Sequence, residues 1–175
     1  MLALETLGML GISLLFVGIV LVMNGVARFC SFDAKSTAFM NLVTGSIIIV
    51  GNLLLLSKAF EADSIINFQN VASGFLFGVT YIFIAGINLF KLDLRPFGWF
   101  SLFVAVYAGI MCYMAFDSGA WKFGLLWGAW AVLWLEGFLE LSCKMKIGKI
   151  FPYLCIAEGI FAAFIPSILM LTDKW

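Results

Sequence analysis

The sequence predicts an all-α polytopic membrane protein with six transmembrane helices. Of its 175 residues, 64% are hydrophobic and only 11% are charged, and the mean hydropathy is +1.12. A water-soluble domain cannot solvate a surface of that composition. The chain also divides into six apolar stretches of about 20 residues, the length that crosses a bilayer. The connections are short, so we expect a single domain over residues 1–175, with residues 1–8 as an N-terminal extension before Met9.

The apolar stretches define the expected helices in chain order. Basic residues separate the first from the second, and the polar stretch KAFEADSIINFQN separates the second from the third. Pro96 and Pro152 stand near the first turns of the fourth and sixth, where a missing N–H costs little. Pro166 is expected to kink the sixth. We therefore place the helices at 8–28, 37–57, 71–90, 97–116, 121–142 and 150–171.

The basic residues predict the orientation in the membrane. Seven of the ten lie in the first, third and fifth connections: Arg28, Lys35, Lys91, Arg95, Lys144, Lys146 and Lys149. Cytoplasmic loops carry an excess of Lys and Arg, so these three connections are expected in the cytoplasm. Both chain termini are then expected on the outer side of the membrane.

A weak internal repeat follows the same three connections. Each ends in a basic residue, which is followed four positions later by an aromatic residue, six later by a small polar or polarisable one and ten later by Gly or Ala. The pattern predicts three tandem helical hairpins, arranged around an axis along the membrane normal. The matching positions are Lys35, Arg95 and Lys149; Phe39, Trp99 and Tyr153; Asn41, Ser101 and Cys155; Gly45, Ala105 and Gly159.

Several kinds of function are excluded by residues that the chain lacks. It contains no histidine, and its four cysteines have no C-x-x-C spacing, so no metal or cofactor site is expected. No phosphate loop, Ser–His arrangement or zinc-protease motif is present, which argues against an enzyme. The net charge is zero and no basic cluster indicates nucleic acid binding.

Three tryptophans in the stretch WGAWAVLWLEGFLE carry the main clue to function. Trp127, Trp130 and Trp134 are spaced i, i+3 and i+7, so a helix places them on one face. Membrane tryptophans usually lie at the water interfaces rather than along a helix. The face is explained either by packing against neighbouring helices or lipid, or by a wall for a small planar polar solute. Ring faces offer such a solute dispersion and weak N–H···π contacts that release it easily.

Two other helices carry stripes that match this face. The first has Leu10, Leu14, Val17 and Leu21 on one side, and the third has Phe77 and Tyr81 four residues apart. Each stripe taken alone is typical of ordinary helix packing. Together with the tryptophans they become candidate walls of one path.

Glu158 is the most informative charged position. It lies several residues inside the last apolar stretch, where a lipid-facing carboxylate costs at least about 2.5 kcal/mol. We expect it to face the bundle interior, a water path or a hydrogen-bonding partner. Glu136 and Glu140 lie near the cytoplasmic end of the fifth helix, where they reach the interface or pair with Lys144, Glu140 also linking two hairpins.

The ordered set of motifs resembles the UreI/AmiS family of urea channels and short-chain amide transporters. The strings are LLFVGIVLVMNG, DAKSTAFMN, FLFGVTY, LDLRPFGWFSLFVAV, WGAWAVLWL and AEGIFAAFIP, which touch all six helices in order. The resemblance implies a passive channel for urea or short aliphatic amides in the bacterial inner membrane, a homohexamer with one pore per protomer, and a link to a cytoplasmic urease or amidase. The pore-lining residues that it implies are Leu10, Leu14, Val17, Leu21, Phe77, Tyr81, Trp127, Trp130, Leu133, Trp134 and Glu158.

One departure from the family bears on gating. Acid-gated members carry histidines in longer outer loops, whereas the outer loops here are short and lack histidine. We therefore expect a channel that acid does not gate. Two alternatives stay open, a proton-coupled transporter that uses Glu158 and a structural subunit without transport.

Overall fold

A computed structural model describes residues 2–62 and 65–175, and their fold is entirely helical. Six helices are long and apolar enough to cross a membrane, which confirms the predicted fold class. The last of them has a π-helical middle, so that eight elements follow one another: α1 (Leu2–Cys30), α2 (Ala34–Ala62), α3 (Ile65–Phe90), α4 (Arg95–Asp117), α5 (Trp121–Leu141), α6 (Ile150–Glu158), η1 (Gly159–Phe164) and α7 (Ile165–Leu171).

Three of these helices extend beyond the predicted apolar stretches. α1 already begins at Leu2, so residues 2–8 continue the first helix, while Met1 lies outside the described residues. α2 and α3 continue into the polar stretch between them, as far as Ala62 and from Ile65. Periodic apolar patterns show where a helix crosses hydrocarbon, but a helix also continues into water where nothing in the sequence breaks it.

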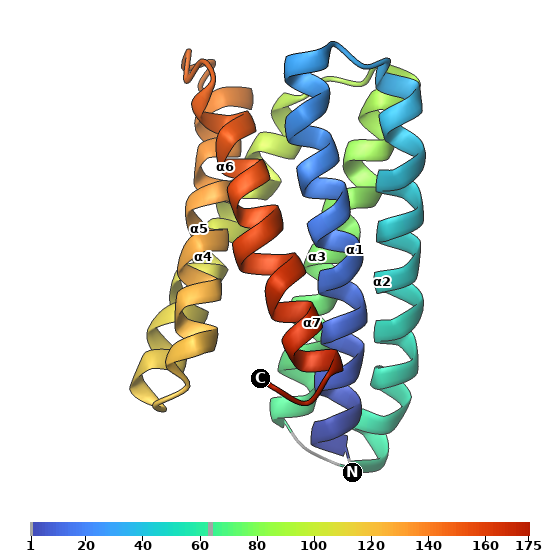
Figure 1. Ribbon diagram of the computed structural model, residues 1–175, viewed down its shortest axis with the longest axis vertical. Helices are drawn as coiled ribbons and strands as arrows, with labels where there is room; N and C mark the ends of the chain where they lie inside the picture. Colours follow the sequence, from blue (N-terminus) through green and yellow to red (C-terminus); the bar gives the residue numbers. More distant parts are fainter. Residues whose placement is uncertain (1, 63–64) are drawn as a thin grey trace.

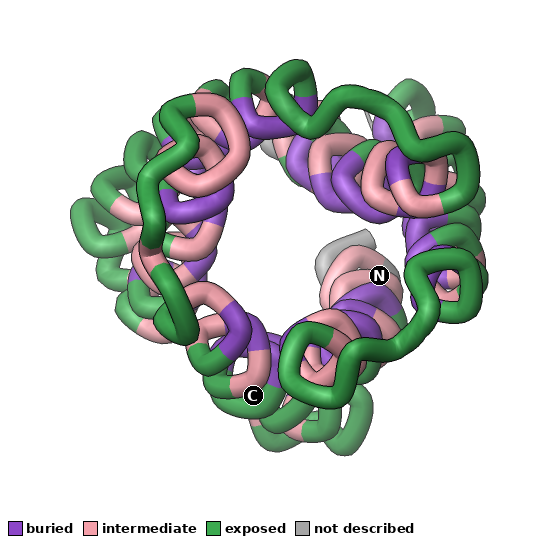
Figure 2. The backbone as a smooth tube through the Cα atoms, turned by 90° about the horizontal axis from the view of Figure 1, so that it is seen from above, coloured by how far each residue is buried: buried purple, intermediate pink, exposed green. Residues whose placement is uncertain are grey.

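The helices form a ring around a central space when the molecule is seen from above, with buried segments on the inner side (Figure 2). Both chain termini lie at one end of the bundle (Figure 1). The connections after α1, α3 and α5 lie at the opposite end, which we call the basic end because these connections and the helix turns beside them hold seven of the ten basic residues.

The closest helix packing joins successive hairpins. α2 packs most extensively on α3 and α4 on α5, while α1 packs along the whole of α6, η1 and α7. The chain does run up and down three times, as the repeat predicted. Its tightest pairs, however, are formed across the end that holds the termini rather than across the basic loops, and the first and last helices close the ring.

Glycines allow two of these pairs to approach backbone to backbone. A Cβ atom on Gly18 would lie 2.8 Å from the carbonyl oxygen of Gly159, and one on Gly159 would lie 3.0 Å from the carbonyl oxygen of Gly18. Gly45 and Gly78 meet in the same manner between α2 and α3, at 2.9 and 3.4 Å. Membrane helices gain van der Waals contact through such small residues, because lipid tails are as apolar as their side chains.

Equivalent positions of the sequence repeat have equivalent surroundings. Phe39, Trp99 and Tyr153 are 65%, 54% and 61% exposed on the outer surface. Two residues further along, Asn41, Ser101 and Cys155 are all buried. The sequence repeat therefore corresponds to a structural repeat. It marks which side of α2, α4 and α6 faces the interior of the bundle.

The π-helical segment lies just before Pro166, near the start of α7. Proline has no N–H and its ring clashes with the carbonyl of the residue four positions earlier, so an α-helix cannot pass through it undisturbed. A π-helical turn is one way to accommodate such a disruption within a membrane helix. The predicted kink thus takes the form of a widened stretch of helix that begins directly after Glu158.

The glycine contact between α1 and η1 leads to a test. Gly18→Ala places a methyl group against backbone that cannot move aside, so we expect a loss of about 1–3 kcal/mol in the free energy of unfolding. Gly109→Ala is the matched control, because nothing lies within 4 Å of a Cβ atom there. Unfolding in detergent measures both variants. Equal stability of the two would contradict the close contact.

Candidate functional site

A cavity of about 300 Å³ occupies the basic-end half of the ring. Residues of α1 to α6 and of the connections at the basic end line it. Seven of the eleven residues that the sequence singled out lie on its wall: Val17, Leu21, Phe77, Tyr81, Trp130, Leu133 and Trp134.

Three helices contribute matching pairs to the deep part of the wall. Each pair is four residues apart, one helical turn, so both members face the cavity: Val17 and Leu21 from α1, Phe77 and Tyr81 from α3, Trp130 and Trp134 from α5. The three stripes that the sequence analysis found separately therefore meet on one surface. Aliphatic side chains form one side of the cavity and aromatic rings the other two.

The aromatic residues of this wall pack on one another edge to face. The ring of Phe77 lies with its centroid 4.9 Å from both Trp130 and Trp134, and Trp127 lies 5.1 Å from Trp130. Such pairs contribute about 0.5–1.5 kcal/mol each beyond their burial. The tryptophan face thus packs between helices and, through Trp130 and Trp134, also lines the cavity. Trp127 packs on Trp130 but does not itself line the cavity.

The remaining four predicted pore residues do not line the cavity. Leu14 is buried in the core, and Leu10 and Trp127 pack against that core in the half of the bundle that holds the termini. Glu158 is only 5% exposed and lies at the end of α6. Their role as pore-lining residues stays a prediction.

Two carboxylates are buried without hydrogen-bond partners among the described residues. In Glu158 the Oε2 atom is unpartnered, and in Glu136 both carboxylate oxygens are. Glu158 faces the bundle interior, as expected for an ionisable group at this depth. Glu136 was expected near the interface, yet it is buried in the bundle and only 7% exposed.

An ion pair between α1 and α5 stands at the basic end of the cavity. Arg28 donates from Nη1 and Nη2 to the two carboxylate oxygens of Glu140, at 2.9 and 2.8 Å. The guanidinium also lies over the ring of Phe151, 4.9 Å from its centroid. Glu140 therefore pairs with Arg28 and not with Lys144, which had been considered as its partner, and it does link the first hairpin to the third. Two parallel bonds favour the planar guanidinium over an ammonium group.

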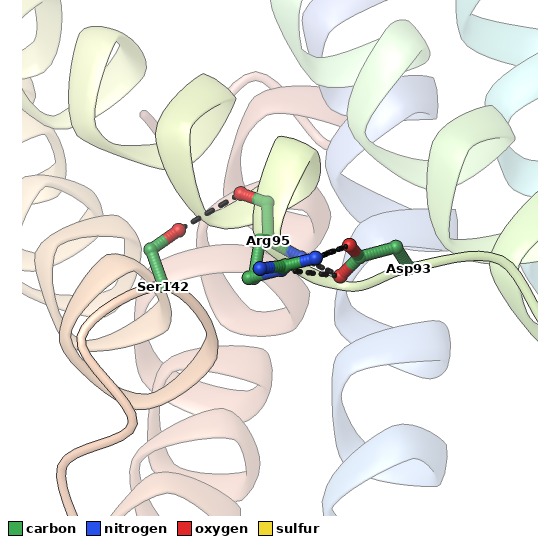
Figure 3. A network of polar contacts seen from close by, with 3 residues as sticks. All are labelled: Asp93, Arg95 and Ser142. Carbon is green, nitrogen blue, oxygen red and sulfur yellow. Dashed lines mark hydrogen bonds and ion pairs between the residues drawn. The ribbon is translucent and has the colours of Figure 1, made fainter.

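A second polar network lies beside this ion pair, at a surface recess that Asp93 and Arg95 line together with Arg28 and Glu140 (Figure 3). Arg95 donates from Nε to Asp93 at 2.8 Å, and its carbonyl oxygen accepts a hydrogen bond from the hydroxyl of Ser142, also at 2.8 Å. The side-chain and backbone hydrogen bonds from Arg95 lower the pKa of Asp93 to about 2. The carboxylate consequently stays ionised at any physiological pH, and the start of α4 is fixed to the end of α5.

Amide side chains form a third polar group, of which the sequence repeat marks only Asn41. Asn24 and Asn41 exchange hydrogen bonds between their carboxamides, at 3.0 and 2.9 Å. Asn88 donates to the hydroxyl of Thr37 at 3.4 Å. Asn24, Thr37 and Asn88 line the cavity, whereas Asn41 is fully buried behind them. A polar residue near the end of an apolar helix is the only sequence signal that these positions carry.

Comparison with known proteins assigns the chain to a family. The sequence profile of the AmiS/UreI family transporter matches residues 9–174. The chain belongs to this family. Among its relatives is the acid-activated urea channel of Helicobacter pylori strain J99, 37% identical over 95% of this chain and all of the relative. A protein of Mycolicibacterium smegmatis named for the transport of amidate substrates is 33% identical over 94% of this chain and 78% of the relative.

A solved structure of the family agrees with the fold described above. The crystal structure of the urea channel from Helicobacter pylori superposes with a TM-score of 0.88, at 38% identity, and covers 95% of this chain and 99% of that one. A second structure, of the Helicobacter pylori channel in a closed state, gives a TM-score of 0.87. The protein is thus a multi-pass membrane protein of a transporter family.

The Arg28–Glu140 ion pair is testable by a double-mutant cycle. The two side chains are 39% and 21% exposed, so solvent screens part of their attraction, and we expect a coupling of about 0.5–1 kcal/mol between Arg28→Met and Glu140→Gln. Unfolding in detergent at low salt measures it. The same cycle with Lys144→Met in place of Arg28→Met should give no coupling. A larger coupling to Lys144 would contradict the observed pairing.

Proposed function

We propose that the protein is a passive channel that conducts urea and short aliphatic amides across the bacterial inner membrane. The observation that carries this proposal is the cavity wall in which α1, α3 and α5 each present a pair of side chains, Trp130 and Trp134 among them. The printed names of the relatives, a urea channel and a protein for amidate substrates, agree with it.

The shape of the wall suits a flat, uncharged solute. A urea molecule has a planar face for dispersion contact with indole rings and N–H groups for weak contacts with their π-electrons. Tyr81 and Glu158 offer brief hydrogen bonds on the way. None of these contacts binds the solute tightly, and a conducting path has to avoid tight binding.

Ions are disfavoured by the same wall. The deep part of the cavity is lined by apolar and aromatic side chains, and Arg28 at its mouth is already neutralised by Glu140. An ion that entered would lose its hydration without a cage of oxygens to replace it. Neutral solutes with few hydrogen-bonding groups lose much less.

We propose an orientation from the distribution of charges and an assembly from the family resemblance. With the basic end in the cytoplasm, both termini lie on the outer side. We infer a homohexamer in which each protomer has its own path. Exposed aromatic residues on α2 and α4, such as Phe39 and Phe103, then face lipid or neighbouring protomers. A cytoplasmic urease or amidase would consume the solute that enters.

A proton-coupled transporter is the second candidate. Glu158 supports it, because its carboxylate is buried and one of its oxygens has no hydrogen-bond partner among the described residues. Proton coupling requires a group that alternates between charge states during each transport cycle. A channel instead responds only to the solute gradient.

Urea uptake into proteoliposomes tests the proposal. Purified protein should equilibrate urea and acetamide at rates independent of a proton gradient. Trp134→Ala enlarges the cavity, so the ratio of butyramide flux to urea flux should change by about threefold or more. One or two methylene groups contribute at least that much to discrimination between solutes in an apolar pocket. Trp99→Ala, on the outer surface, is the control and should leave the ratio unchanged. Uptake that follows a proton gradient and is abolished by Glu158→Gln would favour the transporter instead.

Acid is expected to leave the channel open. The chain has no histidine, the side chain that ordinarily titrates between about pH 5 and 8, and Asp93 at the basic end stays ionised down to pH about 2. Urea flux at about pH 5 and about pH 7 should therefore agree within about twofold. Stopped-flow light scattering on the same proteoliposomes provides the comparison. A large gain of flux in acid would contradict it.

A further inference from the structure

The amide group at the basic end of the cavity has hydrogen-bonding capacity that the protein itself does not use. Asn41 is fully engaged, since it exchanges bonds with Asn24 and also donates to the carbonyl oxygen of Thr37 at 2.9 Å. Asn88 makes a single long bond, from Nδ2 to the hydroxyl of Thr37. Within the described part of the chain its Oδ1 atom accepts no hydrogen bond, and one of its two N–H groups is also unused.

Three other polar side chains on the same wall are already engaged within the protein. The hydroxyl of Thr80 donates to the carbonyl oxygen of Leu76, and that of Ser101 to the carbonyl oxygen of Phe97, both at 2.8 Å. Arg28 is bound to Glu140. Asn88 is therefore the wall residue that combines a donor and an acceptor in one plane and holds both available for a solute.

The protein itself shows what such a group binds. The Asn24–Asn41 pair consists of two carboxamides that donate to each other's oxygens, which forms a closed ring of two hydrogen bonds. A molecule with a planar C(=O)–NH₂ group can form the same ring with Asn88. Urea has this group and so do primary aliphatic amides, whereas alcohols and fully N-substituted amides lack the matched pair.

We propose that Asn88, held by Thr37 beside the Asn24–Asn41 pair, is a docking subsite for the carboxamide group of the solute at the basic end of the cavity. The proposal deepens the proposed channel function and rests on it. A solute that leaves the aromatic wall regains at Asn88 the hydrogen bonds that it gave up there, before it reaches the charged mouth at Arg28 and Glu140. Asn88 is thus a positioning residue, and it favours carboxamides over other solutes of equal size.

Competition between two carboxamides in proteoliposomes tests the subsite. Labelled urea uptake is measured against rising concentrations of unlabelled acetamide in the wild type, in Asn88→Leu and in the control Thr80→Val. Asn88→Leu keeps the side-chain shape and removes both hydrogen bonds. It should raise the half-inhibiting acetamide concentration about fivefold, the worth of roughly one net hydrogen bond. Thr80→Val should leave it unchanged, because that hydroxyl is used within its own helix.

The outcomes separate this proposal from the function on which it rests. Absence of urea uptake by the wild type would overturn both. Uptake with equal acetamide inhibition in the wild type and Asn88→Leu would overturn the subsite alone. An equal effect of Thr80→Val would show a general change of the cavity and would also overturn it. If Asn88→Leu unfolds at a lower temperature than the wild type, Asn88→Ser, which keeps one hydrogen-bonding group, replaces it and should raise the half-inhibiting concentration by a smaller factor.

Discussion

The close approach of α1 to the last membrane helix is the contact on which the rest of the structure depends. Gly18 and Gly159 bring two backbones together and so close a ring from helices that are first and last in the chain. Only a closed ring can present three odd-numbered helices to one interior. If these two helices separated, the cavity would open toward lipid and Glu158, next to Gly159, would lose its shield from the hydrocarbon.

The interior of the ring divides into zones of different chemistry along the membrane normal. Paired charges and amide side chains occupy the basic end, and aliphatic and aromatic side chains occupy the deeper part of the cavity. Arg28 at the mouth is paired with Glu140, and Arg95 beside it with Asp93, so these two guanidinium charges are each balanced by a carboxylate. A neutral solute meets surfaces that change gradually from polar to apolar, whereas an ion meets none that replaces its water.

Local spacing predicted the features that depend on one helix at a time. The separation of Trp130 from Trp134, of Phe77 from Tyr81 and of Val17 from Leu21 is one helical turn in each case, and each pair does share a face. Partners from distant parts of the chain leave no such signal. Glu140 has Lys144 four positions away, the usual helix spacing for an ion pair, yet it binds Arg28, which is 112 residues distant in sequence. The bidentate ion pair between two packed helices is thus preferred over the local pair of Glu140 with Lys144.

Other features escaped prediction because they arise from packing alone. The π-helical form of residues 159–164 depends on how the backbone relaxes before Pro166, for which several solutions exist. Asn88 reads as one polar residue at a helix end, and only the surrounding bonds reveal that its carboxamide is available. The burial of Glu136 depends on which face of α5 meets α6, and that cannot be read from α5 by itself.

The pairing of α1 with α6, η1 and α7 also sets an order of events during synthesis. α2 and α3 can pack as soon as both are in the membrane, and so can α4 and α5, because each pair is adjacent in the chain. The groove at Gly18 has no occupant until more than a hundred further residues have been made. In terms of contact order, two thirds of the ring forms from local contacts and the final closure is a single long-range step. Until that step the helices of the nascent protein form an open layer, and the face of α1 that later packs on α6, η1 and α7 has no partner.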